Sequence, residues 1–289
     1  MTSGPTAAAP GAAAGPNHGR RVLVAWVVLS VVATPLVAAF LGPAIPPGNG
    51  STQASEQVFD NTWMVSVITP VICLLVVFFA YALTRFRLER GGDAVLDGPP
   101  LRSDARIQVL WIVATSVIVL FFAGFGTFEL LQNGAGGGQG PSPVAIPGGP
   151  KLEVQVIAQQ WQFTYRYPTF GGMESNQLVL PENTDVALHV TSLDAVHSFW
   201  AYELGVKADA SPGVDNVAFV KTKGPRTFHV RCAELCGLWH GYMFNNGRVV
   251  TAAGFRSWAA GAKKTYAPIA KYMPKYAHTY LPDPQRRAG

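Results

Sequence analysis

The stretch "FHVRCAELCGLWHGYMFNNG", residues 228–247, begins with alternating apolar and polar side chains and then gathers four residues that can bind a metal ion. They are Cys232, Cys236, His240 and Met243, in the spacing Cys-x3-Cys-x3-His-x2-Met. Alternation with period two predicts a strand over 227–232. On that strand the first cysteine shares its face with Phe228 and Val230, so its thiol is expected to point into a core.

Three chemistries are compatible with this loop. A disulfide between the two cysteines suits an oxidising compartment, but it would close a very short ring, stabilise little, and leave His240 and Met243 without a role. Zinc accepts two Cys and two His, whereas a thioether such as Met243 favours copper. Two thiolates can bridge two copper ions, with one imidazole for each metal. Copper is therefore the preferred interpretation.

The second imidazole is expected from His197 in "LDAVHSFW", which follows a predicted strand. Two of the six histidines lie in the terminal tails. His229 falls on the strand face opposite Cys232, and His189 falls opposite the apolar face of its own strand. We expect His229 to face solvent and His189 to have a structural role. Cys73 lies within an apolar run, where packing is its expected role.

The chain has 289 residues and a mean hydropathy of +0.21, and its first half contains three apolar runs long enough to cross a bilayer. They are Val22–Leu41, Thr62–Leu83 and Ile107–Leu131. Arginines precede the first run and recur in the loop 84–106, whereas the loop 42–61 has no Lys or Arg. The positive-inside rule therefore places the N-terminus and the 84–106 loop in the cytoplasm and everything after the third run outside. A cleaved signal peptide remains an alternative for the first run.

The second half predicts short strands separated by turns. Period-two runs occur at 152–158, 161–167, 186–190, 216–221 and 227–232, which favours an antiparallel sandwich or barrel. The expected organisation is a disordered tail (1–21), a first span (22–41), a helical hairpin (62–131), a Gly/Pro linker (132–150), an all-β domain (151–258) and a basic tail (259–289). That tail accounts for the net charge of +5. Because no basic stripe accompanies a recognition element, nucleic acid is not an expected partner.

The motifs "CAELCGLWHGYM" and "DAVHSFW", behind membrane spans and a Gly/Pro linker, resemble subunit II of haem–copper cytochrome c oxidases. The resemblance covers about residues 62–260. It implies N-terminal transmembrane helices, two or three in number, followed by a cupredoxin-like sandwich that holds the binuclear copper centre CuA.

The resemblance also implies roles for individual residues. Cys232 and Cys236 match the bridging thiolates, His197 and His240 the terminal imidazoles, and Met243 an axial thioether. Glu234 matches a residue whose carbonyl is the other axial ligand and whose carboxylate binds magnesium at the interface with subunit I. Trp161 in "QQWQFTY" matches the tryptophan at which electrons enter from cytochrome c, and Asp194 and Asp209 match further family positions.

The sequence departs from the family pattern at several points. Gln162 and Phe163 follow Trp161 where the family usually has Tyr and Trp, and Gln108 stands where a carboxylate opens one proton pathway. These departures indicate a divergent bacterial member in the plasma membrane, with its sandwich outside. The haem-attachment pattern C-x-x-C-H is absent from the sequence. The cytochrome c donor is therefore expected to be separate or part of a cytochrome bc complex.

The expected function is electron entry into a terminal oxidase. Electrons would pass from copper to haem in subunit I, where oxygen is reduced to water and protons are translocated. Other oxidase subunits and membrane lipid are the remaining expected partners. The alternative is the CuA-containing subunit of a membrane nitric oxide reductase.

Overall fold

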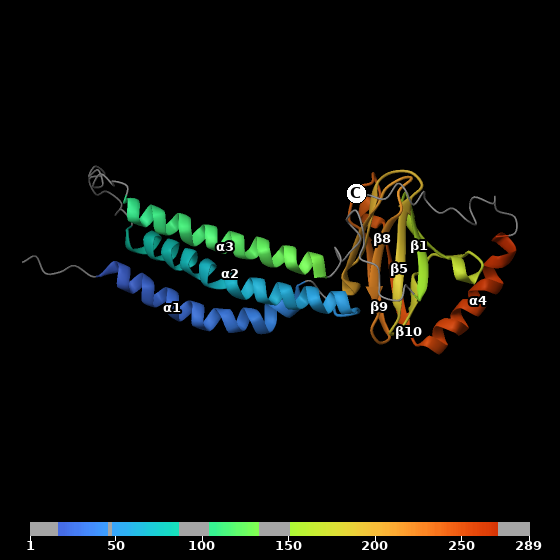
Figure 1. The fold of residues 1–289 in the computed structure, drawn as a ribbon, viewed down its shortest axis with the longest axis horizontal. Coiled ribbons are helices and arrows are strands. Elements are labelled where there is room, and N and C mark those ends of the chain that lie inside the picture. The colour runs from blue at the N-terminus through green and yellow to red at the C-terminus, as the bar shows by residue number, and fades with distance from the viewer. Residues whose placement is uncertain (1–16, 46–47, 87–103, 133–150, 271–289) are drawn as a thin grey trace, which may run out of the picture. The chain divides into compact units, whose positions relative to one another are not determined.

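The computed structural model describes residues 17–45, 48–86, 104–132 and 151–270 (Figure 1). Its helices are α1 (His18–Leu36), continued by η1 (Val37–Leu41) and η2 (Gly42–Ala44), then α2 (Thr52–Arg85), α3 (Ala105–Gln132) and α4 (Ala252–Ala270). The first three are long and apolar enough to cross a membrane, with mean hydropathies of 2.3 to 2.5. The expected tail before residue 17, linker from 133 and tail after 270 lie outside the described residues.

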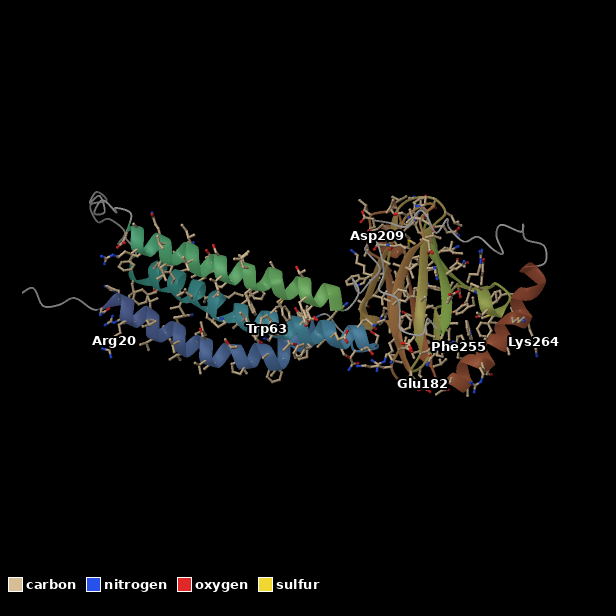
Figure 2. The ribbon with its side chains drawn as sticks, in the orientation of Figure 1. Arg20, Trp63, Glu182, Asp209, Phe255 and Lys264 are labelled. Atoms are coloured by element: carbon tan, nitrogen blue, oxygen red, sulfur yellow. The ribbon has the colours of Figure 1, made fainter. Side chains whose placement is uncertain are left out.

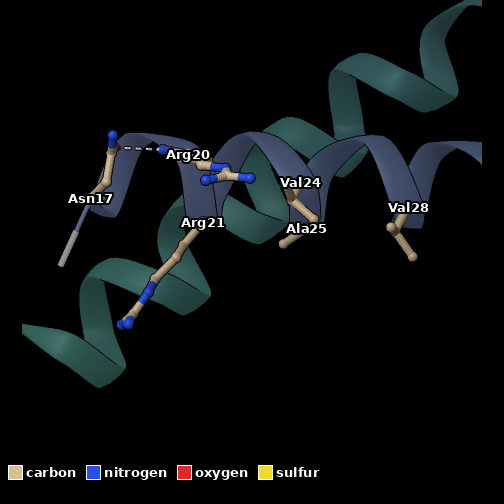
Figure 3. A pocket seen from close by; sticks show the side chains of 6 residues that line it. All are labelled: Asn17, Arg20, Arg21, Val24, Ala25 and Val28. Carbon is tan, nitrogen blue, oxygen red and sulfur yellow. Dashed lines mark hydrogen bonds between the residues drawn. The ribbon is translucent and has the colours of Figure 1, made fainter.

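Helix α1 begins at His18, four residues before the predicted span. The side chain of Asn17 caps it by accepting a hydrogen bond of 3.0 Å from the backbone N–H of Arg20. Arg20 and Arg21 border a shallow hollow on this end of the helix (Figure 3). Their positive charges precede the apolar part of α1, which is the pattern expected at a cytoplasmic membrane surface.

Helices α1 and α2 run antiparallel. Near one end His18 Nδ1 lies 2.7 Å from the Tyr81 hydroxyl, and farther along the indole N–H of Trp26 donates a 2.8 Å hydrogen bond to the carbonyl of Pro70. Cys73, on the same helix as Pro70, is buried. Its burial agrees with the packing role expected from the sequence.

The β-domain consists of two five-stranded sheets. Their strands are β1 (Leu152–Gln159), β2 (Gln162–Tyr167), β3 (Met173–Ser175), β4 (Val179–Pro181), β5 (Asp185–Ser192), β6 (His197–Ala201), β7 (Val206–Ala210), β8 (Asn216–Lys221), β9 (Arg226–Cys232) and β10 (Phe244–Val250). Sheet 1 has the order β3-β2-β1-β5-β8, and sheet 2 has the order β4-β10-β9-β6-β7. The chain thus consists of apolar helices followed by a cupredoxin-like β-sandwich, as predicted.

The sheets are mixed, whereas the strand pattern had predicted antiparallel pairing throughout. β1 pairs with β5 and β10 with β4 in parallel, and the other pairs are antiparallel. Period-two alternation shows which face of a strand is buried, but it carries no information about the direction of the neighbouring strand. The predicted runs correspond to β1, β2, β5, β8 and β9. The strands that the pattern missed are short or carry polar residues, as in "FNNGRVV" of β10.

Aromatic side chains of β2 form the centre of the core. Phe163, Tyr165 and Tyr167 are almost fully buried between the sheets. The Tyr165 hydroxyl donates to Asn245 Oδ1 at 2.9 Å, and the Tyr167 hydroxyl donates to the carbonyl of Val179 at 2.9 Å. Burial raises the pKa of both tyrosines, so each remains neutral and its hydroxyl is satisfied inside the core.

Helix α4 closes one side of the sandwich. Phe255, labelled in Figure 2, and Ala259 are buried against the core. The Trp258 ring meets the Tyr167 ring edge-on, with the ring centroids 5.1 Å apart. The helix extends through Ala270, so it includes the first residues of the segment that the sequence had assigned to a basic tail. Its apolar face, and not its net charge, determines where it packs.

The segment before α2 is attached to the sandwich. Ser51 is fully buried, and its hydroxyl donates to the carbonyl of Leu204 at 2.6 Å while accepting from the backbone N–H of Ala54 at 2.9 Å. The backbone N–H of Gly50 donates to the carbonyl of Glu203 at 2.8 Å. Residues 44–60 accordingly belong to the same compact unit as the strands. The loop between the first two spans therefore contributes to the β-domain.

Gly247 of β10 offers a direct test of this packing. A Cβ at this position would overlap the ring of Phe228 on β9. We expect Gly247→Ala to lower the free energy of unfolding by about 1–3 kcal/mol through overpacking. Urea unfolding of the full chain in detergent, followed by near-UV circular dichroism, measures this loss.

A second substitution identifies the cause. Phe228→Leu replaces the ring with a smaller side chain and leaves a cavity, so this substitution is destabilising by itself. In the double variant the new methyl group fills part of that cavity, and the two losses should be less than additive. Strict additivity would show that the overlap between these two positions is not the source of the effect.

Candidate metal centre

Strand pairing brings the two ligand segments together. β6 and β9 are antiparallel, with Phe199 opposite Cys232. His197, two residues before Phe199, therefore lies just beyond the end of β9, where the loop from Ala233 to Met243 begins. This loop returns to the sheet at β10, where the backbone N–H of Cys232 donates to the carbonyl of Met243 at 3.0 Å. All predicted ligands thus meet at one end of sheet 2.

The donor atoms form a connected cluster. The two cysteine sulfurs lie 3.7 Å apart, too far for a disulfide bond of about 2.0 Å, and both thiols are free. Cys232 Sγ lies 3.9 Å from His197 Nδ1, and Cys236 Sγ lies 3.6 Å from His240 Nδ1. Met243 Sδ is 3.8 Å from Cys236 Sγ. The loop therefore does not adopt the disulfide geometry.

These separations suit metal coordination. Two ligand atoms bonded at about 2.0–2.3 Å to one tetrahedral metal lie roughly 3.3–3.8 Å apart. His197 is fully buried, and Cys236 and Met243 are nearly so. A set of thiolates, imidazoles and a thioether is typical of a copper site. The residues present therefore fit the metal that the resemblance implies.

The backbone carbonyl and the side-chain carboxylate of Glu234 lie in different environments. The carbonyl oxygen lies 3.2 Å from Cys232 Sγ and accepts a hydrogen bond from the thiol, so this oxygen faces the cluster. The Glu234 side chain is exposed. The carbonyl can approach a metal at the thiols while the carboxylate remains available to a different partner.

Asp194 orients the ligand His197. Asp194 Oδ1 lies 2.9 Å from His197 Nε2, so the imidazole presents Nδ1 to the cluster. The other carboxylate oxygen accepts the backbone N–H of Gln160 at 2.8 Å. Burial opposes ionisation, but the bonds from Gln160 and His197 outweigh it and hold the pKa of Asp194 below its usual value. A charged carboxylate behind a metal-binding imidazole fixes its tautomer and orientation.

Gln160 and Trp161 connect sheet 1 to the ligand loop. The side-chain amide of Gln160 donates to the carbonyl of Cys236 at 2.8 Å, and the half-buried Trp161 indole N–H donates to the same oxygen at 3.3 Å. Gly237 allows this approach, since a Cβ there would lie 3.0 Å from Gln160 Nε2. The sequence reasoning missed Gln160. Its position immediately before Trp161 was the available signal, but its contact with Cys236 depends on the fold.

The remaining strand histidines lie outside the cluster. His189 pairs with Asp215 at 2.9 Å on the outer face of sheet 1, and His229 pairs with Glu203 on sheet 2. Both have carboxylate partners. The His229 side chain is 51% exposed, as expected from its strand face, and His189 is held by Asp215 in a structural role. Burial, reinforced by the neighbouring Cys232, raises the pKa of Cys236. In the metal-free chain this thiol is therefore protonated, and metal binding must release its proton.

A membrane-anchored sandwich with this donor cluster at one end belongs to the cupredoxin-like class of metal-binding domains. The family model for the periplasmic domain of cytochrome c oxidase subunit II matches residues 173–250. Cytochrome c oxidase subunit 2 of Thermostichus vulcanus is 27% identical over 278 residues, covering 81% of this chain and 84% of the relative. A probable subunit 2 of Rickettsia prowazekii is 29% identical over 180 residues, covering 55% and 54% respectively.

Solved structures give similar matches. The crystal structure of the periplasmic domain of cytochrome oxidase subunit II from Bradyrhizobium japonicum is 32% identical, with a TM-score of 0.39, and covers 40% of this chain and 96% of that one. The sequence relatives and the family model confirm the resemblance to subunit II of cytochrome c oxidase. The apolar helices and the match to a periplasmic domain fit a membrane protein with an extracytoplasmic domain.

The contact between Asp194 and His197 predicts an effect on metal affinity. We expect Asp194→Ala to weaken copper binding about 10- to 100-fold, because the imidazole loses the group that orients it. Competition with a chelator of known affinity measures the change. Since the pKa of Asp194 is lowered by folding, its stabilising contribution is present at neutral pH and is lost as the pH falls through its folded-state value.

Asp215→Ala is the matched control, because it removes a carboxylate from His189 on the other sheet. Its copper affinity should equal that of the unmodified chain. Equal losses in both variants would assign the effect to general destabilisation and contradict the orienting role of Asp194.

Proposed function

We propose that this chain is the electron-entry subunit of a terminal respiratory oxidase. It accepts electrons from cytochrome c at a binuclear copper centre and passes them to haem in subunit I, where oxygen is reduced to water and protons are translocated. The observation that carries this proposal is the pair of free thiols 3.7 Å apart, each with its own imidazole beside it.

The donors fall into two nearly equivalent halves, which supports two metals over one. His197 Nδ1 and the Glu234 carbonyl lie beside Cys232, while His240 Nδ1 and Met243 Sδ lie beside Cys236. Each half offers one imidazole and one weaker donor, and both thiolates would be available to the two metals. A single copper site would need only one thiolate. Copper held here supplies one-electron redox chemistry.

Electron transfer suits this site better than hydrolysis. Four of the five donor side chains are buried and only His240 is partly exposed, so the cluster offers little room for a substrate. Buried ligands on paired strands move little when the charge of the centre changes. The chain's contribution is to hold these donors rigid and dry, since electron transfer is faster when little reorganisation accompanies it.

Trp161 provides the proposed entry point. Its ring is half-buried, packs against the core, and donates its indole N–H to the carbonyl of the ligand residue Cys236. A side chain in this position has one edge available to a donor and the other in contact with the ligand loop. Tryptophan suits such half-wet positions because it combines a large apolar ring with one polar group.

Two buried oxygens support a magnesium site at the interface with subunit I. Ser198 Oγ and Asp209 Oδ1 are buried without a hydrogen-bond partner among the residues that the structure describes, and the two residues are opposite each other on β6 and β7. The backbone N–H of Ala233, next to Glu234, donates to the carbonyl of Ser198 at 2.9 Å. The exposed Glu234 carboxylate and these oxygens therefore lie on the same side of sheet 2. A cation and groups from subunit I would supply their missing partners there.

The remaining parts of the proposal concern the setting. The membrane is the bacterial plasma membrane, the haem groups belong to the partner subunit, and the donor is a separate cytochrome c or a cytochrome bc complex. Three candidate spans and membrane lipid anchor the chain. Haem analysis and oxygen uptake of the purified complex would separate this function from nitric oxide reduction.

Metal content tests the binuclear assignment. The full chain in detergent, loaded with copper under reducing conditions, should bind two copper ions and give a mixed-valence EPR signal with thiolate absorption in the visible region. Oxidation to a Cys232–Cys236 disulfide should prevent loading because it removes both thiolates. One copper ion per chain, or stoichiometric zinc, would contradict the assignment.

Substitution of Trp161 tests the entry point. Trp161→Phe should leave folding and the copper spectrum intact while slowing reduction by cytochrome c at least about tenfold, equivalent to roughly 1.4 kcal/mol of barrier. Stopped-flow reduction measures the rate, and thermal unfolding measures the stability. Trp258→Phe, a half-buried tryptophan on α4, is the control and should leave the rate unchanged. A destabilised Trp161 variant with normal reduction kinetics would mean that electrons enter elsewhere.

A further inference from the structure

The middle of the ligand loop is poorly anchored by its own side chains. Within residues 233–239 the one buried residue is Cys236, whereas Leu235 and Leu238 are 78% and 83% exposed. Apolar side chains that stay in solvent gain nothing from the hydrophobic effect. The conformation of this segment therefore depends on polar contacts with the rest of the sandwich.

Those contacts converge on one oxygen atom. In the described part of the chain, two side chains of sheet 1 donate hydrogen bonds to the carbonyl of Cys236: the Gln160 amide at 2.8 Å and the Trp161 indole at 3.3 Å. The Cys232 thiol donates to the carbonyl of Glu234, but this thiol loses its proton when a metal binds. The Cys236 carbonyl is thus the point at which sheet 1 holds the centre of the loop.

The two donors to this carbonyl are not equivalent. A distance of 2.8 Å is within the usual range for N–H···O hydrogen bonds, whereas 3.3 Å lies just beyond it. The Trp161 ring also packs against the core, while the Gln160 amide bonds to Cys236 alone among the described residues. Gln160 therefore makes the stronger bond, and its side chain serves this contact.

The backbone of Gln160 is itself firmly held. Gln160 and Trp161 form the two-residue turn between β1 and β2, where Gln159 pairs with Gln162. Strand pairing fixes the geometry of such short hairpin turns. The Gln160 N–H also donates to Asp194 Oδ2 at 2.8 Å. An amide on this turn can therefore hold the loop at a defined distance from sheet 1.

The loop is shaped to receive this amide. Gly237, which follows the anchored carbonyl, has a φ of +116°, a conformation that glycine adopts far more readily than other residues. A Cβ there would lie 3.0 Å from Gln160 Nε2. Glycine at this position thus permits both the backbone turn and the close approach of the amide.

Anchoring the carbonyl of Cys236 also restricts its thiol, because both belong to the same residue. Cys236 Sγ lies 3.7 Å from Cys232 Sγ and 3.6 Å from His240 Nδ1. A loop that already has this arrangement needs no further ordering when the metal binds, and ordering costs affinity.

We propose that Gln160 is a positioning residue of the metal centre: its amide holds the ligand loop, through the Cys236 carbonyl, in the metal-binding conformation before a metal arrives. The proposal rests on the proposed function for the identity of the metal. It also separates the roles of two neighbours, since Gln160 holds the loop while Trp161 remains available for electron entry.

The experiment compares two substitutions at this position in the full chain in detergent, with the thiols kept reduced. Gln160→Met keeps the length of the side chain but removes the donor. Gln160→Glu keeps its shape and places an acceptor opposite the carbonyl, because an ionised carboxylate cannot donate. Gln57→Met is the matched control, since it removes another 2.8 Å bond from a glutamine amide to a backbone carbonyl, that of Gly205.

Hydrogen exchange of the metal-free chain measures the order of the loop. The N–H groups of His240 and Tyr242 bond to carbonyls within the loop, so their exchange reports its opening. We expect exchange to be about five- to tenfold faster in Gln160→Met and faster still in Gln160→Glu. The control should match the unmodified chain.

Copper binding gives a second readout. Copper affinity should fall about tenfold in Gln160→Met and further in Gln160→Glu, and the thiolate absorption should shift in Gln160→Glu because the Cys236 sulfur is displaced. Trp161→Phe should speed loop exchange more in the Gln160→Met background than in the unmodified chain, since the indole is then the remaining donor.

Unchanged loop exchange and copper affinity in both Gln160 variants would overturn the proposal. Full retention in Gln160→Glu with a loss in Gln160→Met would also overturn it, because side-chain shape and not the donor would then matter. Equal losses in Gln57→Met would assign the effect to general destabilisation. Failure of the proposed function has a separate signature: the unmodified chain would bind one copper ion or zinc, while exchange in the metal-free chain would still test the anchor.

Discussion

The antiparallel pairing of β6 with β9 is the contact on which the rest of the site depends. It places Phe199 opposite Cys232 and thereby sets His197, thirty-five positions earlier in the chain than Cys232, beside the first thiol. Backbone hydrogen bonds fix the register, and a slip by one residue would turn His197 and Cys232 out of the core. A metal site built on such a pair is as rigid as the sheet itself.

Sheet 1 stabilises this arrangement from the opposite side. Asp194 links the ligand His197 to the backbone of Gln160, and the Gln160 side chain returns to the carbonyl of Cys236. These bonds form a chain that links one residue from each half of the donor set. Asp194 and Gln160 are themselves exposed, so the chain ties the buried donors His197 and Cys236 to the surface of the sandwich.

The two sheets give the sandwich distinct surfaces near the metal. Trp161 reaches the ligand loop from sheet 1, while Ser198 and Asp209 lie opposite each other on the outer face of sheet 2. Strand alternation produces such surfaces, since one side of each strand holds the core and the ligands while the other remains available to partners.

The sequence by itself predicted the membrane spans, the sandwich, five of its strands and the donor residues, because these depend on local hydropathy, period-two alternation and close spacing of soft ligands. It gave no basis for the parallel pairs β1–β5 and β4–β10, the packing of α4 beyond residue 258, or the burial of Ser51 against Leu204. It also missed the contact of Gln160 with Cys236, seventy-six positions apart. Such features arise where segments distant in the chain meet. Only the tertiary structure decided them, because the contacts that stabilise them involve residues that no local sequence pattern identifies.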